Sequence, residues 1–251
     1  MKLKIASFNI SCGFYVNNQS VDLFDKEKSK DVDFRFLNEI IKIINDEDID
    51  IICFQEIITT KRFNYINKIL EKTSLNYESH FELSPSHIIE NAEFGIAILS
   101  KYPINNNIKK FFTNPMLSKT TSSGKTYYIY DKGFLISTVY INNNCINVLT
   151  HHGFPFRRFN STPKDNINTF IEFDNYIKEY RPDIITVDFN SEDYIDMMLY
   201  TNDNYIKTVN EATTDDGMKF DNILIRKDIK YSSKIIKSLS DHYMVIDNIE
   251  F

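Results

Sequence analysis

The chain has 251 residues, of which 42% are hydrophobic and 25% charged, and its formal net charge is −6. This ordinary globular mixture excludes wholesale disorder, and only six Gly and six Pro exclude collagen-like or linker-rich architectures. Taken alone, the acidic balance argues against a protein that wraps nucleic acid through a broad basic face.

Strands and helices are predicted to alternate along the chain. β-Branched and apolar runs predict strands at 3–10, 49–54, 95–100, 133–141, 145–150, 184–187, 222–225 and 243–246. Apolar residues that share one helical face predict helices at 34–44, 63–70 and 164–180. Continuous apolar strands need cover on both faces, so this pattern predicts an α/β fold with two mixed sheets packed together and flanked by helices. Since no linker or repeat divides the sequence, we expect a single domain over residues 1–251.

The cysteines and the lengths of the apolar segments indicate the cellular compartment in which we expect the protein. Cys12, Cys53 and Cys145 are odd in number and far apart, which favours reduced thiols over a disulfide framework. The first residues lack the apolar core of a secretory signal, and no apolar run approaches the roughly 18 residues of a membrane span. We therefore expect a cytoplasmic protein with no stable membrane insertion, and a monomer is favoured.

Polar residues gather where the predicted strands end or begin. Asn9, Glu56, the pair His151 and His152, and Asp188 with Asn190 follow strands, whereas Asp221, Asp241 and His242 precede them. In layered α/β folds the ligand site collects at strand ends. Each residue alone has a plain structural interpretation: a turn for either asparagine, a helix or turn cap for a carboxylate, and no chemistry for an isolated histidine pair. The ordered set favours a common cleft.

The sequence resembles the endonuclease/exonuclease/phosphatase superfamily, which has the DNase I-like fold. The resemblance is carried by the motifs SFN, QE, GIAILSKYP, TH, DFN, D and SDH, in this order. The resemblance spans residues 7–245 and implies a four-layer α/β/β/α sandwich. Two departures stand out. Val187 occupies the position of the usual Gly before the aspartate, and His152 follows His151 where the family often has an apolar residue or Thr.

The resemblance also implies roles for individual residues. It implies metal binding by Glu56, Asn9 and Asp241, water activation by Asp188 with Asn190, phosphate contact by His151 and His242, and control of His242 by Asp221. The cofactor implied is Mg²⁺ or Mn²⁺, and few carboxylate ligands suit an ion that keeps much of its water. No Ser or Cys lies in a nucleophile motif, so direct attack by water on a phosphodiester is expected.

Two segments mix basic and aromatic residues and are candidates for substrate contact. Residues 113–130 carry Lys119 and Lys125 among tyrosines, and residues 153–164 place Arg157 and Arg158 between phenylalanines. Lys132 and His152 are further candidates. Such mixtures suit single-stranded nucleic acid, although a packed loop with surface arginines is the simpler alternative.

Three functions remain open from the sequence. The first is a nuclease or phosphodiesterase acting on DNA or RNA, and this interpretation is preferred. The second is a phosphatase or phosphodiesterase acting on a small-molecule or lipid phosphate of the inositol phosphate or sphingomyelin type. The third, an inactive binding protein, is least favoured because no catalytic residue type is missing.

Overall fold

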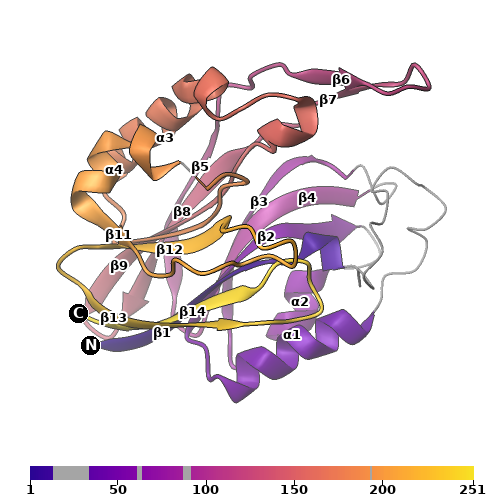
Figure 1. The fold of residues 1–251 in the computed structure, drawn as a ribbon. Helices are drawn as coiled ribbons and strands as arrows, with labels where there is room; N and C mark the ends of the chain where they lie inside the picture. Colours follow the sequence, from indigo (N-terminus) through magenta and orange to yellow (C-terminus); the bar gives the residue numbers. More distant parts are fainter. Residues whose placement is uncertain (14–33, 61–63, 87–91, 193) are drawn as a thin grey trace.

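Two six-stranded β-sheets form the centre of the molecule (Figure 1). The computed structural model describes residues 1–13, 34–60, 64–86, 92–192 and 194–251. The first sheet has the order β13 (Lys230–Ile236), β14 (Met244–Glu250), β1 (Lys2–Asn9), β2 (Ile51–Thr60), β4 (Ala92–Ser100) and β3 (Tyr77–Pro85). The second has the order β11 (Tyr205–Lys207), β12 (Asp221–Arg226), β10 (Ile184–Asp188), β9 (Asn144–His152), β8 (Gly133–Ile141) and β5 (Ile104–Phe111).

Helices cover the outer face of each sheet. The first sheet is covered by α1 (Phe34–Asp46) and α2 (Tyr65–Leu70), and the second by α3 (Ile167–Tyr180) and α4 (Leu199–Asn204). Short 3₁₀ turns lie at Ser11–Gly13 (η1), Phe156–Phe159 (η2), Lys164–Asn166 (η3) and Ile195–Met197 (η4). A separate hairpin of β6 (Ser118–Thr120) and β7 (Thr126–Tyr128) projects beyond both sheets.

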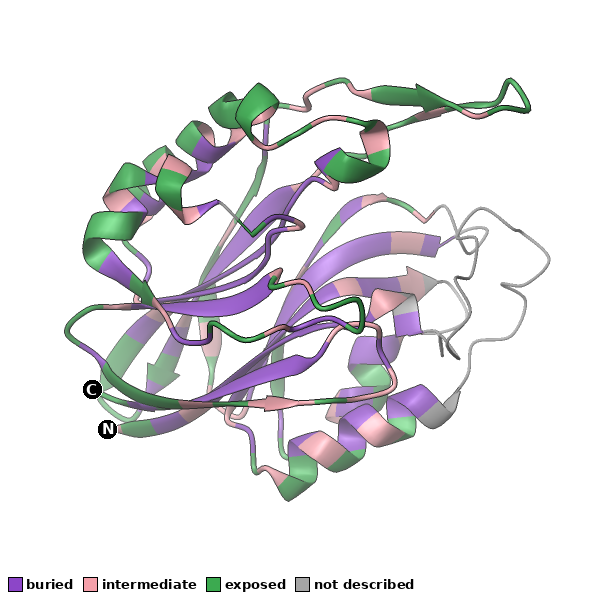
Figure 2. Ribbon diagram, in the orientation of Figure 1, coloured by how far each residue is buried: buried purple, intermediate pink, exposed green. Residues whose placement is uncertain are grey.

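Three apolar clusters hold these four layers together, and the buried residues concentrate on the sheets (Figure 2). One cluster, which includes Ile5, Leu135 and Ile223, lies between the sheets. The other two fill the spaces between each sheet and its helices. Burial of apolar area in these clusters is the main force that packs the layers. The predicted α/β/β/α sandwich of two mixed sheets is therefore confirmed.

Each sheet contains one parallel pair of strands, flanked by antiparallel neighbours. The parallel pairs are β1 with β2 and β9 with β10, while β14 and β12 run antiparallel beside them. The C-terminal ends of the parallel strands and the starts of β12 and β14 therefore meet at one end of the sandwich. This arrangement brings polar residues from distant parts of the sequence together.

The structure differs from the predicted elements in several places. Strand β2 does not end at Phe54 but runs to Thr60, and the helix predicted over 164–180 is a 3₁₀ turn followed by α3. Of the helix predicted over 63–70, Phe63 lies outside the described residues and α2 begins at Tyr65. None of the helices in the described ranges has the length and apolar character needed to cross a membrane.

Candidate active site

A row of five acidic and histidine side chains crosses the end of the sandwich from one sheet to the other. Glu56 Oε1 lies 3.5 Å from His152 Nε2, which lies 3.5 Å from Asp188 Oδ2. Asp188 Oδ2 lies 4.0 Å from His242 Nδ1, and this nitrogen is 2.8 Å from Asp221 Oδ2. Strand pairing creates the row, since Asp188 is registered beside both His152 and Asp221.

Asp221 and His242 form a partly buried ion pair within this row. Burial raises the pKa of the Asp221 carboxyl, and the neighbouring His242 opposes that rise. Burial alone would lower the pKa of His242, but the carboxylates of Asp221 and Asp188 outweigh it and hold the pKa well above its ordinary value. The imidazole is therefore cationic near neutral pH, with Nδ1 engaged by Asp221.

Two asparagines fix the carboxylate of Asp188, whose side chain is only 1% exposed. Asn9 Nδ2 donates to Asp188 Oδ2 at 2.7 Å, and the backbone N–H of Asn190 donates to Oδ1 at 2.8 Å. The amide oxygen of Asn9 accepts from the backbone N–H of Ser11 at 2.8 Å. Both ends of the Asn9 amide therefore have partners, and its nitrogen holds the carboxylate of Asp188. The metal-binding role expected of Asn9 stays a prediction.

Glu56 projects into the site from a β-bulge. Strand β2 shifts register against β4 between Phe54 and Ile57, so two residues on β2 oppose one on β4. Glu56 adopts a φ of 55°, in the left-handed region that non-glycine residues seldom occupy, and Asn190 has a φ of 50°. Strained backbone of this kind persists where surrounding structure holds it, and it often marks functional positions. The bulge allows the strand to continue while the Glu56 side chain, 24% exposed, faces the cleft.

The neighbouring histidines of β9 face opposite sides of their sheet, as alternation along a strand requires. His151 packs among rings under α3, with centroids 4.4 Å from Phe173 and 4.9 Å from Phe112. Its Nδ1 lies 3.1 Å from the Gly133 carbonyl oxygen, and burial lowers its pKa to about 3. The expectation that His151 contacts phosphate is corrected: His152 faces the acidic row.

The remaining predicted residues occupy different surroundings. Lys132 Nζ lies 2.9 Å from His152 Nδ1, beside the row. Asn190 Nδ2 lies 3.0 Å from His152 Nε2, to which Lys132 Nζ is also close at 3.3 Å. Arg158 lines the adjoining cavity, whereas Arg157 is exposed and is not part of its lining. Asp241 accepts hydrogen bonds from the hydroxyls of Ser11 and Ser240, which anchor it beside the end of β1.

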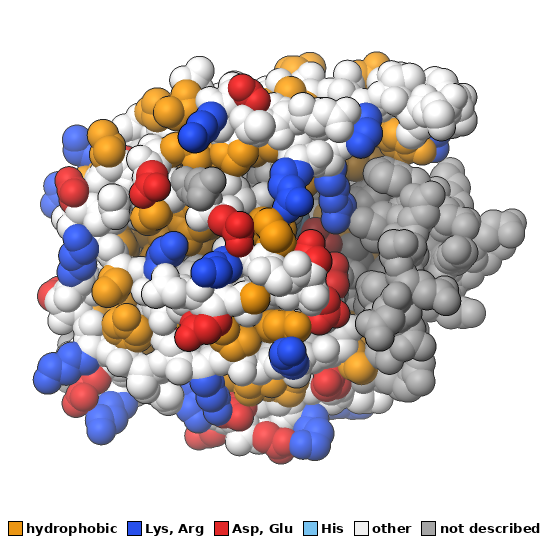
Figure 3. All heavy atoms as spheres, in the orientation of Figure 1, with side chains coloured by type: hydrophobic (Ala, Val, Ile, Leu, Met, Phe, Trp, Pro, Cys, Tyr) orange, Lys and Arg blue, Asp and Glu red, His pale blue; other side chains and the backbone are white. Residues whose placement is uncertain are grey.

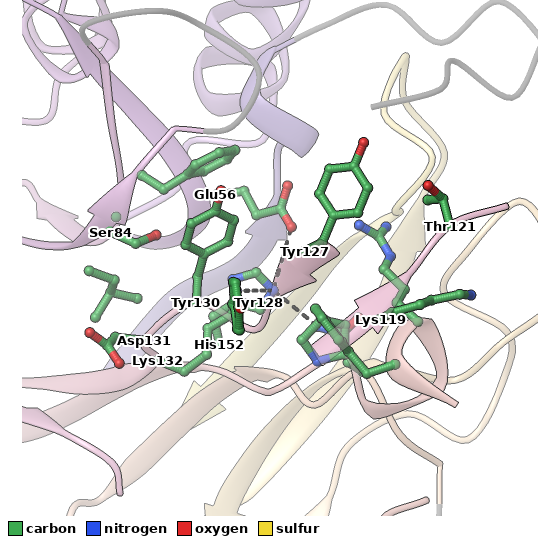
Figure 4. Close-up of a pocket in the computed structure, with 17 residues that line it drawn as sticks. Glu56, Ser84, Lys119, Thr121, Tyr127, Tyr128, Tyr130, Asp131, Lys132 and His152 are labelled. Carbon is green, nitrogen blue, oxygen red and sulfur yellow. Dashed lines mark hydrogen bonds and ion pairs between the residues drawn. The ribbon is translucent and has the colours of Figure 1, made fainter. Parts of the chain in front are cut away.

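A cavity of about 510 Å³ opens next to the row (Figure 4). Its lining includes Glu56 and His152, which belong to the row, and the neighbouring Asn190. The cavity and the row are therefore contiguous. The close-up shows Glu56, Tyr127 and Tyr130 among the side chains that line this cavity. In the space-filling view, basic side chains lie just above a column of acidic side chains to the right of centre (Figure 3).

Several residues at the site were not singled out from the sequence as contributors, although Gln55, Thr150 and Ser240 stand within the QE, TH and SDH motifs. The Ser240 hydroxyl donates to the Asn9 carbonyl oxygen at 2.9 Å and ties the loop before β14 to the end of β1. Gln55 Nε2 donates to Thr150 Oγ1 across the two sheets. Phe94 and Ser84 line the cavity from β4 and β3. Their roles depend on contacts across the fold, which spacing in the sequence does not reveal.

The donor set fits a hard divalent cation. Within the described residues, ligand atoms of Asp188, Asp221 and His242 lie within 4.8 Å of one another. His242 Nδ1 and Asp221 are engaged with each other, and both oxygens of Asp188 accept hydrogen bonds. This leaves the carboxylate of nearby Glu56 as the principal oxygen donor. Mg²⁺ and Mn²⁺ accept a few carboxylate ligands and retain water, as this arrangement requires.

Comparison with known proteins agrees with this architecture. No family model and no curated protein matches the sequence. An endonuclease/exonuclease/phosphatase structure from Beutenbergia cavernae superposes with a TM-score of 0.72 at 13% identity, covering 100% of this chain and 72% of that one. The human Nocturnin catalytic domain with bound sulfate gives 0.66 at 14% identity, covering 100% and 93% of the two chains.

A mannosyl-6-phosphatase from Bacteroides thetaiotaomicron gives a TM-score of 0.61 at 14% identity, covering 99% of this chain and 100% of that one. At these identities the likeness establishes the fold. The chain has the endonuclease/exonuclease/phosphatase, DNase I-like fold that its motifs led us to expect.

Proposed function

We propose that this protein is a divalent-metal-dependent phosphoric ester hydrolase that cleaves a phosphodiester bond of nucleic acid by direct attack of water. The observation that carries the proposal is the continuous row from Glu56 to Asp221, which spans both sheets beside an open cavity. The similar structures include a phosphatase by name, which supports the reaction class.

Asp188 is the residue placed to orient and deprotonate the attacking water. Its carboxylate is buried and accepts hydrogen bonds from Asn9 and Asn190, so its orientation is set before substrate binds. A general base fixed in this way contributes about 10² to 10⁴ to the rate. The neighbouring Asn190 side chain, near His152, is placed to hold the water or a phosphate oxygen.

His242 and His152 supply contacts to the phosphate oxygens. With Nδ1 held by Asp221, the cationic ring of His242 has Nε2–H as its remaining donor for an oxygen that gains negative charge in the transition state. Burial and the nearby Lys132 lower the pKa of His152 well below its ordinary value, so this ring is neutral. Lys132 adds a positive charge at the same edge of the cleft.

Glu56 is the residue that would hold Mg²⁺ or Mn²⁺. Such an ion, when bound, offsets the charge of the phosphate and of the carboxylates around it. This also accounts for an acidic protein acting on a polyanion, since attraction would come from the ion together with Lys132 and Arg158. Asp241, anchored near the end of β1, adds negative charge to the same region.

A small-molecule phosphate is the alternative substrate, favoured by the size of the cavity. Sites for small ligands commonly occupy about 300–1,000 Å³, and this cavity of about 510 Å³ falls within that range. One substrate panel separates the two functions. It contains single-stranded DNA and RNA, an inositol phosphate, sphingomyelin and a sugar phosphate, each with Mg²⁺, Mn²⁺ or EDTA.

We expect cleavage of the oligonucleotides with Mg²⁺ or Mn²⁺ and its loss in EDTA. Asp188→Asn should reduce kcat about 100-fold or more because it removes the base. Asp203→Asn, an exposed aspartate on α4, is the matched control and should retain full activity. The proposal fails if no phosphate ester is hydrolysed with any of these ions, or if both variants behave alike.

A further inference from the structure

The cavity beside the acidic row is built from aromatic and basic side chains on three separate elements. The hairpin and the segment after it contribute Lys119, Tyr127, Tyr128 and Tyr130. The edge of the first sheet contributes Phe94 from β4 together with Leu83 and Ser84 from β3, and the η2 turn contributes Pro155, Arg158 and Phe159. Aromatic rings therefore line the cavity on several sides above a polar floor.

The β6–β7 hairpin contributes little to the core. All three residues of β6 are exposed, and in β7 only the middle residue, Tyr127, is partly buried. The hairpin forms its own two-stranded sheet, a unit that is marginally stable by itself. The hairpin nevertheless presents Tyr128, which is 67% exposed, at the cavity, and the segment after it presents Tyr130, 42% exposed. An exposed aromatic group beside a chemical site is typical of a surface that binds a ligand.

We propose that this cavity is the subsite for one unpaired nucleobase next to the scissile phosphate, and that the β6–β7 hairpin selects single-stranded ends over duplex. This inference rests on the proposed function. Aromatic side chains stack on bases of any sequence, and Lys119 and Arg158 at the rim match the flanking phosphates.

The size and position of the cavity support a single base. Its volume of about 510 Å³ suits one nucleotide, and its floor includes Glu56 and His152 of the acidic row. A base in this cavity therefore places its own phosphate at the row. A base paired within a duplex cannot enter, because it must first leave the stack at a cost of a few kcal/mol.

The test uses three oligonucleotides of one sequence: a single strand, a blunt duplex, and a single strand with an abasic terminal nucleotide. Tyr128→Ala removes an exposed ring without disturbing the core, and Tyr77→Ala, at the far end of β3 and 40% exposed, is the matched control. Turnover is measured with Mn²⁺, and binding of the same fluorescently labelled strands is measured in EDTA.

We expect wild type to prefer the single strand over the duplex by about tenfold or more. Tyr128→Ala should raise KM for the intact strand by about tenfold, with little effect on the abasic strand, while Tyr77→Ala changes neither. Equal effects of Tyr128→Ala on intact and abasic strands would overturn the base subsite. A sugar phosphate turned over with the same Tyr128 dependence would assign the cavity to a sugar and also overturn it.

Binding in EDTA separates this inference from the proposed function. Base-dependent binding that Tyr128→Ala weakens, without turnover of any ester, would retain the subsite and reject the hydrolase. Turnover that is equal for intact and abasic strands would retain the hydrolase and reject the base subsite. If wild type binds intact and abasic strands equally, the base subsite is rejected whatever the turnover.

Discussion

Gln55 Nε2 donates a hydrogen bond to Thr150 Oγ1 at 3.0 Å and so joins β2 of one sheet to β9 of the other. The same amide lies 3.3 Å from Ser7 Oγ of β1. All three side chains are buried. The contact lies next to the row of acidic and histidine side chains, because Gln55 precedes Glu56 and Thr150 lies two residues before His152.

Removing this contact should destabilise the fold. Gln55→Ala leaves two buried hydroxyls without their donor and opens a cavity, so we expect the free energy of unfolding to fall by about 2–4 kcal/mol. Urea denaturation measures this, with Asn168→Ala on the exposed face of α3 as the control. A loss no larger than that of the control would show that the bridge does not stabilise the packing of the sheets.

The two histidines of β9 should respond in opposite ways to substitution. His152→Ala should lower kcat/KM about 100-fold, because the ring lies between Glu56 and Asp188. His151→Phe should retain most activity, since a phenyl ring suits the cluster of Phe112 and Phe173. Steady-state kinetics on one oligonucleotide decides the matter. Full activity in His152→Ala would contradict the placement of this histidine at the phosphate.

Substitutions of Asp221 and Glu56 should differ in their effects on kcat and on the affinity for Mn²⁺. Asp221→Asn removes the partner that keeps His242 charged, so kcat should fall about 100-fold while the affinity for Mn²⁺ changes little. Glu56→Gln should weaken Mn²⁺ binding more strongly, because a carboxylate ligand is lost. Calorimetric titration with Mn²⁺ alongside kinetics provides both readouts. Equal losses of Mn²⁺ affinity in the two variants would refute these roles.

Asp247 should make the stability of the protein depend on pH. Its carboxylate is buried, neither oxygen has a hydrogen-bond partner in the described part of the chain, and burial raises its pKa from 3.8 to about 6. The hydroxyls of Ser233 and Thr208 lie near and oppose the rise. The folded state therefore binds the proton more tightly, and the stabilisation that protonation provides is complete below pH 3.8 and lost as the pH rises through 6.

The resulting contribution amounts to about 3 kcal/mol between the two ends of that range. Asp247→Asn should remove this dependence and make the protein more stable than wild type at pH 8. Unfolding midpoints in urea at pH 5 and pH 8 test the effect, with Asp228→Asn, at an exposed position after β12, as the control. If the unfolding midpoint changes between pH 5 and pH 8 by the same amount in wild type and in Asp247→Asn, the raised pKa of Asp247 is contradicted.

The sequence predicted the eight inner strands of the two sheets and missed all four edge strands. Inner strands are buried on both faces and therefore read as apolar runs, as in Ile184–Val187. The edge strands β3, β5, β11 and β13 are polar and partly exposed, a composition that also suits loops. The hydrophobic pattern of the sequence therefore predicts the inner strands of this fold but not the edge strands.

The site residues show a similar limit. Their positions at strand ends were predictable, because the pattern of apolar run followed by polar residue is local. Which of His151 and His152 faces the cleft depends on the register of β9, and a shift of one residue reverses the answer. The bulge at Glu56 depends on how β2 meets β4, which nothing in the residues themselves signals.

The meeting of strand ends from both sheets has a consequence for how activity is lost. Asn9, Glu56 and His242 come from the first sheet, and His152, Asp188 and Asp221 from the second. Neither sheet alone carries a working set of groups. A partial unfolding that parts the two sheets, while each keeps its own backbone hydrogen bonds, would abolish turnover with the secondary structure still intact. The rate of the proposed reaction is therefore expected to report early unfolding of this protein more sensitively than circular dichroism.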